Sequence, residues 1–578
     1  MRKVLLYICS VFILGGMTSC EDFLDKREDV GLTEDDIFRD YYSLRGFLDQ
    51  SFNQLENVMV MDNWENGRAF VGLFADEMAT TDNSSAVFTL HSGNWLSNAK
   101  SSTTFEIGNG GSTAISRSYK ALRINNRIIN DIDKAPLTPE QKNEILGQAY
   151  FYRSWFYFQI IKRYGGMPII DKVFEGGDDD IPRMTYHESH DWMMEDIQKA
   201  IYMLPDSWDD PNYGRPTKIA AMALKEWAQL FDASPLMQND LNSTENKGYD
   251  TERAKSAAKS AYEVIRYMDG SKSAPYPYGL ASKEEYTNIF YFKYPPVHQP
   301  EYIWVKRQFP NADNQNQKRT IRTFWQYEDL AFGSGPDGNS MCCPSLNIVN
   351  MFDKKGADGI YYPIDDPRSG YALDYDHKPF EDRDPRFYNN ILLPGTTWGH
   401  YADGRTYYIT TYKGGAAYQH MLTQKDCNKR MFTGFMCKKF MWPECNQYLE
   451  KNNPNCWWDY RFLTIYIRAS QIYLDYAEAL FEGCGSATAT IEGCPISAAE
   501  AINILRRRIG LTDLPSDIVA DPDKFRAAYR RERAVELMFE NHRWWDIRRW
   551  MILEETFKDT YPIKGALFTI LKFECLHH

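Results

Sequence analysis

Apolar residues at intervals of three and four dominate two blocks of the chain, from about Thr33 to Asp269 and from about Thr464 to Glu555. This spacing gathers apolar side chains on one face of an α-helix and therefore predicts amphipathic helices. The expected helices are Thr33–Val58, Ser112–Ile132, Thr138–Tyr164, His187–Leu204, Pro216–Ala233, Thr251–Met268, Leu463–Glu482, Ser497–Ile509 and Asp523–Glu554.

Several of these segments carry helix start and stop signals. Thr138 precedes Pro139, which suits the first position of a helix because proline lacks a donor that the helix would leave unpaired there. Gly165 and Gly166 follow the same segment, and glycine tolerates the left-handed dihedrals that end helices. Thr33, with Asp36 three residues later, is expected to cap the first helix.

The region between the two blocks, from Gly270 to about Tyr460, is rich in Gly, Pro, Asn, Asp and aromatic residues. It contains short extended pieces such as Tyr302–Val305 and Tyr407–Tyr412. The chain is therefore predicted to be mainly α, with a tetratricopeptide-like scaffold of helical hairpins and a large loop-rich insert containing short strands. No clean repeat of 34 residues can be traced.

The N-terminus has the pattern of a secretory signal. Arg2 and Lys3 precede an apolar stretch from Val4 to Leu14, which is too short to cross a membrane. The run Met17–Cys20 resembles a bacterial lipobox, which implies a signal peptide at residues 1–19 and a lipid anchor on Cys20. An ordinary cleaved signal with an incidental cysteine is the alternative. The acidic residues directly after Cys20 resemble the surface-export signal of Bacteroidetes lipoproteins.

Composition narrows the possible partners. A net charge of −13 argues against binding to nucleic acid or to an anionic membrane surface, because both need clustered Lys and Arg. Aromatic residues make up 15% of the chain, so either the helices pack on aromatic rings or a ligand stacks on them.

None of the cysteines has Cys-x-x-Cys spacing, so no zinc site is predicted from them. Local disulfides at Cys427–Cys437 and Cys484–Cys494 are plausible.

Short motifs in a fixed order resemble the SusD/RagB family of outer-membrane glycan-binding lipoproteins. The most recognisable is Gly147–Phe158, which leads to Arg163–Pro168. The other matching segments are Ser118–Asn126, Gly214–Lys218, Ala220–Leu224, Pro344–Leu346, Met351–Phe352, Asp358–Gly359, Asp384–Phe387, Tyr473–Ala479, Ala501–Asn503, Arg506–Leu511, Glu532–Glu540 and Arg543–Asp546. The final residues, Phe573–His578, depart from the aromatic, proline-containing tail of the family.

This resemblance implies one SusD-like domain over residues 20–578, with a helical part at 20–269, the insert at 270–460 and a second helical part at 461–578. It also implies a non-enzymatic protein, anchored by lipid to the outer membrane and exposed at the cell surface. Such a protein captures oligosaccharide or polysaccharide and delivers it to a SusC-like TonB-dependent outer-membrane transporter. A surface glycoside hydrolase and a binding subunit for peptide or another nutrient are the alternatives.

Ligand contacts are expected in loops, because packing does not already explain an aromatic residue there. Sugars are bound by flat aromatic faces together with planar polar groups that hydrogen-bond to hydroxyls. Trp95 lies among small and polar residues, and Trp325 with Tyr327 precedes a Gly-Ser loop. The full set of expected ligand-binding residues is Trp64, Asn94, Trp95, Asn98, Trp325 and Tyr327.

Other polar clusters are interpreted as structural, so no cofactor, metal site or catalytic residue is predicted. His187 and His190 lack the spacing of a zinc protease motif and are expected to be surface histidines. The acidic runs Asp178–Asp180 and Glu381–Asp384 lack the alternating oxygen ligands of a calcium loop and are expected to be solvated turns. Near the end, Glu532, Glu536 and Glu540 recur every four residues beside Arg533, Arg543 and Arg548, which predicts an ion-pair face on one helix.

Overall fold

The computed structural model describes twelve segments of the chain. They are 33–55, 71–79, 114–174, 180–239, 245–274, 276–290, 299–307, 343–373, 376–400, 406–415, 433–440 and 463–558. Helices dominate the segments before residue 271 and after residue 468, whereas the region between them has short strands and turns. The predicted mainly helical class with a loop-rich insert is therefore confirmed.

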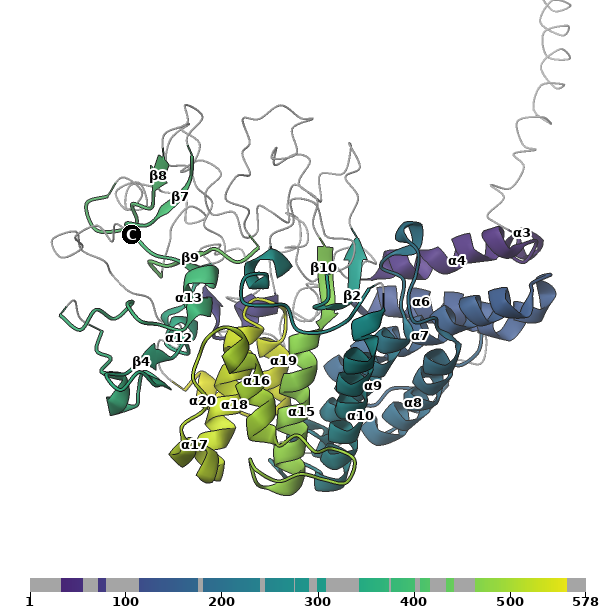
Figure 1. Cartoon of the computed structure of the whole chain (residues 1–578). Coiled ribbons are helices and arrows are strands. Elements are labelled where there is room, and N and C mark those ends of the chain that lie inside the picture. The colour runs from purple at the N-terminus through teal and green to yellow at the C-terminus, as the bar shows by residue number, and fades with distance from the viewer. Residues whose placement is uncertain are drawn as a thin grey trace, which may run out of the picture.

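The N-terminal helices form a row in which each helix packs against the next (Figure 1). They are α3 (Glu34–Ile37), α4 (Tyr41–Gln54), α6 (Ala114–Asp131), α7 (Pro139–Tyr164), α8 (Tyr186–Met203), α9 (Lys218–Ala233) and α10 (Thr251–Gly270). The row continues into the C-terminal part of the chain, because α15 (Ala469–Cys484) packs on α10 and α16 (Ala498–Arg508) packs on α15. The connection between α6 and α7 is short, whereas the connections from α7 to α8, from α8 to α9 and from α9 to α10 are longer. The row of packed helices agrees with the helical scaffold that the sequence predicts.

Local signals fix most helix ends where they were expected. The Thr138 hydroxyl accepts a hydrogen bond from the Gln141 backbone N–H, and the Gln141 side chain accepts one from the Thr138 N–H. At the other end of α7, Gly165 has φ of 78°, a dihedral that favours glycine. A Cβ at Gly166 would collide with the carbonyl oxygen of Met184, so the second glycine permits a close approach of two backbone segments.

The helix predicted to begin at Leu463 begins later. Residues Leu463–Arg468 form strand β10, which pairs antiparallel with β2 (Tyr302–Arg307), and α15 starts only at Ala469. All six residues of β10 are buried. A short run buried on both faces has no helical or strand periodicity of its own, so the partner strand decides its conformation.

The long helix predicted over Asp523–Glu554 is also broken. The structure has α18 (Pro522–Glu536), α19 (Arg543–Arg549) and α20 (Leu553–Thr556), with residues 537–542 forming a turn between the first two, called here the 537–542 loop. Phe539 and Asn541 have φ of 63° and 67°, a left-handed region that non-glycine residues seldom adopt. The first predicted helix is likewise divided, because the side chain of Asp40 caps a separate α4.

The insert consists of small antiparallel pairs, as far as the described segments show. The extended piece predicted at Tyr302–Val305 lies within β2, and the piece at Tyr407–Tyr412 overlaps β8. The pairs are β1 (Met78–Ala79) with β3 (Cys343–Pro344), β4 (Lys354–Lys355) with β5 (Tyr361–Tyr362), β6 (Ile391–Leu392) with β9 (Met436–Cys437), and β7 (Thr397–His400) with β8 (Thr406–Tyr408). Short helices α12 (Leu346–Val349) and α13 (Pro385–Asn390) connect some of them.

The glutamates of the 532–540 segment are buried rather than exposed. Glu536 is 0% exposed and lies within 3 Å of guanidinium nitrogens of Arg386, Arg468 and Arg508. The prediction of ion pairs is confirmed, but the predicted partners within the same helix are wrong. The arginines come from α13 of the insert, from strand β10 and from α16, because a helix packed on all sides finds its counter-ions on other elements.

The arginines expected to pair with these glutamates also bind elsewhere. Arg533 contacts Asp475 and Asp546, and Arg543 forms a two-pronged pair with Asp76.

The suggested Cys484–Cys494 disulfide is wrong, since both thiols are free. Cys494 is buried in the core, whereas Cys484 is half-buried at the end of α15, so proximity in sequence does not join them. Cys437 is a free thiol as well, and Cys427 lies outside the described residues.

Candidate ligand-binding pocket

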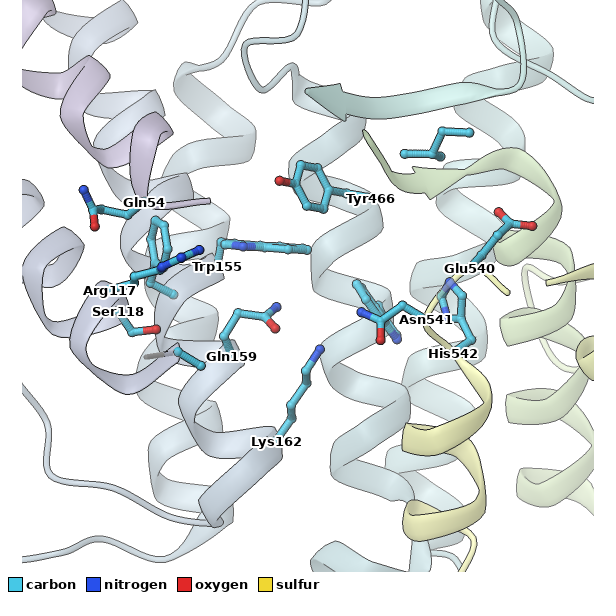
Figure 2. A pocket seen from close by; sticks show the side chains of 14 residues that line it. Gln54, Arg117, Ser118, Trp155, Gln159, Lys162, Tyr466, Glu540, Asn541 and His542 are labelled. Atoms are coloured by element: carbon cyan, nitrogen blue, oxygen red, sulfur yellow. The ribbon is translucent and has the colours of Figure 1, made fainter. Parts of the chain in front are cut away.

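A small pocket with a cavity volume of about 20 Å³, room for about one water molecule or one hydroxyl group, lies where α6, α7, α9, β10 and the 537–542 loop meet (Figure 2). Helix α7 contributes Trp155, Gln159 and Lys162 at intervals of four and three, which places them on one face of the helix. Tyr466 of β10 and Asn541 of the loop complete the opposite side. Residues far apart in the sequence therefore share one small space.

Aromatic rings form one wall of the pocket. The ring of Trp155 meets Tyr466 at a centroid distance of 5.3 Å and Trp304 at 4.7 Å, both edge to face. The ring of Trp227 lies at a centroid distance of 6.0 Å from that of Trp155, in a tilted arrangement. Edge-to-face pairs are favourable because the positive ring edge meets the negative ring face. The wall is thus held rigidly before any ligand arrives.

Three buried polar atoms of the pocket lack a hydrogen-bond partner among the described residues. They are Nε2 of Gln159, Nε1 of Trp227 and Oδ1 of Asn541. The oxygen of the Gln159 side chain accepts a hydrogen bond from Arg163 at 2.9 Å, so the amide group is oriented with its NH₂ left over. Each such atom costs about 1–3 kcal/mol when it is left unpaired. Two donors and one acceptor therefore await a polar ligand or water.

The polar side chains converge in space. Figure 2 shows Gln159, Lys162 and Asn541 pointing toward the same opening between the helices. The ammonium group of Lys162 also lies 4.6 Å from the ring centroid of Trp545 and 5.2 Å from that of Trp227. Cation–π contacts of this kind hold a lysine side chain in place.

The remaining charges of the pocket are already compensated. Burial, together with the nearby Arg533, holds the pKa of His542 well below its ordinary value, so its imidazole is neutral at pH 7. Although burial alone would raise the pKa of Glu540, Arg468 and Lys439 lower it overall, and both cations contact its carboxylate. Glu540 is the one carboxylate among the described lining residues, and glycoside hydrolysis ordinarily needs two.

The 537–542 loop is clamped by the segment that precedes β1. The Phe539 backbone N–H donates to Oε2 of Glu77 at 3.0 Å, and Arg543 donates to both oxygens of Asp76 at 2.8 and 2.9 Å. Lys439 donates to the Met538 carbonyl at 2.8 Å from the other side. These contacts sustain the left-handed dihedrals that deliver Asn541 and His542 to the pocket.

Two family models match the chain over most of its length. Residues 300–566 match the model described as the SusD family, and residues 22–226 match the model described as starch-binding associating with outer membrane. The chain belongs to the SusD/RagB family. The resemblance inferred from the motifs is therefore confirmed. A search of curated proteins found no significant match.

Solved structures of SusD-like proteins share the fold. A SusD-like protein of Bacteroides fragilis NCTC 9343 is 22% identical, with a TM-score of 0.66, and the alignment covers 93% of each chain. A SusD-like carbohydrate-binding protein of the same organism is 21% identical, with a TM-score of 0.62 over 90% of this chain and 88% of the other. A laminarin-binding SusD-like protein is 18% identical, with a TM-score of 0.58 over 91% and 96%.

The binding residues predicted for this SusD/RagB protein lie outside the described residues. This applies to the lipidation site Cys20 and to the ligand contacts Trp64, Asn94, Trp95, Asn98, Trp325 and Tyr327. They stay predictions. Among the helices that the structure describes, none is long and apolar enough to span a membrane.

The sequence did not predict the pocket residues, because ligand contacts were expected in loops. Trp155 and Gln159 lie instead on the predicted helix Thr138–Tyr164, within or directly after the most recognisable family motif. A usable signal was present, since Gln159 and Lys162 are polar residues within an otherwise apolar stretch of α7 and both are buried. A buried polar side chain needs a partner, and here the missing partner marks the pocket.

Proposed function

We propose that this protein is a surface lipoprotein that captures oligosaccharide and delivers it to a SusC-like TonB-dependent outer-membrane transporter, without catalysing a reaction. One of the two matching family models is described as starch-binding associating with outer membrane, which supports the ligand class and the location. Two relatives of the same fold are described as carbohydrate-binding and laminarin-binding. The net charge of −13 favours an uncharged ligand over a polyanion.

The observation that carries the proposal is the chemistry of the pocket. The unpaired atoms of Gln159, Trp227 and Asn541 suit a hydroxyl group of a sugar, which both donates and accepts, and the buried rings around them hold these atoms in position. Binding a hydroxyl-rich ligand there would remove the cost of leaving these atoms unpaired. We propose that the predicted loop residues Trp95, Trp325 and Tyr327 contribute ring contacts.

The pocket can be tested by substitution. Gln159→Ala is expected to weaken glycan binding by about tenfold, because it removes a donor that no described residue pairs and that the ligand would pair. A glycan array on the purified protein identifies the ligand, and isothermal titration calorimetry then measures its affinity. Gln198→Ala, which changes an exposed glutamine of α8, is the matched control and is expected to bind as the wild type does.

The loop residues form a separate arm of the same test. Trp95→Ala and Trp325→Ala are each expected to lower the affinity in a protein with unchanged melting temperature. If no saccharide binds at millimolar concentration, the proposed function is wrong. If binding occurs and neither set of variants alters it, the ligand binds elsewhere on the protein. Release of shorter products from the bound glycan would instead favour a hydrolase.

The anchor is tested by mass spectrometry of the mature protein. The N-terminal residue is expected to be an acylated Cys20, and Cys20→Ser is expected to move the protein from the membrane fraction to the soluble fraction. An unmodified N-terminus on membrane-derived protein would contradict the lipid anchor. Co-purification of a β-barrel transporter with the tagged wild-type protein tests the proposed partner.

A further inference from the structure

A compact group of nitrogen and oxygen ligands lies on helices α8 and α9, outside the glycan pocket. Residues His187, His190 and Asp191 occupy positions i, i+3 and i+4 of α8, which brings them to one side of the helix. Asp232 of α9 faces them, because α8 and α9 pack side by side. We propose that these four side chains bind a zinc ion.

The distances among the four groups are already short. Nδ1 of His187 lies 2.7 Å from Oδ1 of Asp232, and Nδ1 of His190 lies 3.0 Å from Oδ1 of Asp191 and 3.5 Å from Oδ2 of Asp232. Ligand atoms of His190, Asp191 and Asp232 all lie within 4.8 Å of one another. A single ion at the centre could therefore reach these three side chains with small rotations, whereas His187, which contacts Asp232 alone, must turn farther to become the fourth ligand.

Burial makes the group different from an ordinary surface cluster. The sequence led us to expect surface histidines, but His190 is 3% exposed and Asp232 is 2% exposed. Nδ1 is the ring nitrogen of His190 that faces the two carboxylates. The capping box at Thr185 fixes the start of α8 and so fixes the spacing of the three ligands that this helix carries. The His187 side chain is 30% exposed and provides an entry side.

The ligand set selects the kind of metal. Two imidazole nitrogens and two carboxylate oxygens match the four-coordinate tetrahedral sites that zinc prefers. Calcium takes six to eight oxygen ligands, and magnesium requires octahedral oxygen coordination, so neither fits two histidines. Zinc binding requires the imidazole nitrogens that face the ion to be deprotonated.

Arg253 of α10 is the cation that compensates the group in the metal-free protein. Its Nη1 contacts Oδ2 of Asp232 and lies 3.6 Å from Oδ1 of Asp191. One guanidinium offsets only one of the two carboxylates, whereas Zn²⁺ offsets both. The Arg253 side chain is 31% exposed, so it can turn toward solvent when an ion enters. Zinc and Arg253 should therefore compete for the same carboxylates.

The experiment measures metal binding directly on the purified, chelator-treated protein. Titration calorimetry with ZnCl₂ is expected to give one site, and CoCl₂ is expected to give the visible absorption bands of tetrahedral cobalt. His190→Ala and Asp232→Asn are each expected to weaken zinc binding by about tenfold or more. His377→Ala removes an exposed imidazole of the insert and should leave zinc binding unchanged.

Competition gives a second test that does not depend on losing a ligand. Arg253→Gln is expected to tighten zinc binding by several-fold, since it removes the cation that holds the carboxylates. The proposal is overturned if the wild type binds no zinc, if His190→Ala binds as tightly as the wild type, or if Arg253→Gln does not tighten binding. If Asp232→Asn fails to fold, His187→Ala and His190→Ala decide the matter. Glycan affinity is not involved in any of these readouts.

Discussion

Glu536→Gln is expected to lower the free energy of unfolding by about 3–5 kcal/mol, the range observed when one partner of a buried ion pair is removed. The Glu536 carboxylate accepts hydrogen bonds from Arg386 and Arg468 at 2.9 Å and from Arg508 at 2.5 Å. Burial alone would raise the pKa of Glu536, but the three arginines hold it well below its ordinary value. The variant keeps the shape of the side chain and leaves the guanidinium groups without their shared charge.

Chemical denaturation monitored by circular dichroism measures this effect. Glu554→Gln changes an exposed glutamate of α20 and serves as the control, with an expected change within about 0.5 kcal/mol. Because the folded-state pKa of Glu536 is lowered, its contribution is present above the unfolded pKa and is lost as pH falls through the folded pKa. Equal midpoints for Glu536→Gln and the wild type would show that the cluster does not stabilise the fold.

The free energy of unfolding is expected to fall as the pH rises from about 4.5 to about 8, because the buried Glu77 side chain keeps its proton in the folded protein. Burial raises the pKa of Glu77 from 4.5 to about 8, and the neighbouring charge of Asp76 adds to this, while the hydrogen bond from Phe539 opposes it. The unfolded chain releases this proton near pH 4.5, whereas the folded protein retains it until about pH 8. The stabilising contribution is therefore complete below the unfolded pKa and is lost as pH rises through the folded pKa.

Glu77→Gln separates this effect from other titrations. The amide does not ionise, so the variant should lose the part of the pH dependence between pH 4.5 and 8, which amounts to at most roughly 5 kcal/mol. Denaturation midpoints across this range, for the wild type and for Glu77→Gln, provide the measurement. A wild-type profile that stays flat or rises from pH 5 to pH 8, with the same shape in the variant, would contradict the prediction.

Glu77 also connects stability to the pocket. Its carboxyl group accepts the hydrogen bond from Phe539, one residue before Glu540 and two before Asn541. The 537–542 loop therefore depends on a residue more than four hundred positions earlier in the chain. No pattern within the helix predicted over Asp523–Glu554 contains that information.

The features that the sequence predicted correctly depend on residues close to one another in the chain. Helix α7 begins and ends where Thr138, Pro139 and Gly165 predicted, because a cap involves residues only a few positions apart. The change from helical to loop-rich composition at Gly270 was equally visible, and the ordered motifs identified the family. Patterns of this kind need no knowledge of the partner across the core.

The features that the sequence did not predict depend on partner residues far away in the chain. Strand β10 exists because β2 pairs with it, and the break after Glu536 exists because Asp76 and Glu77 hold the loop. The burial of His190 follows from the packing of α8 against α9.

The sequence by itself determined the helical class, most helix boundaries and the family, since caps, periodicity and motif order depend only on residues close together in the sequence. Only the tertiary structure decided which polar side chains are buried, which charges pair, and which face of α7 lines a pocket. The physical reason is that burial and pairing are properties of contacts between elements, such as Glu536 with Arg386, and the chain brings these together only when it folds.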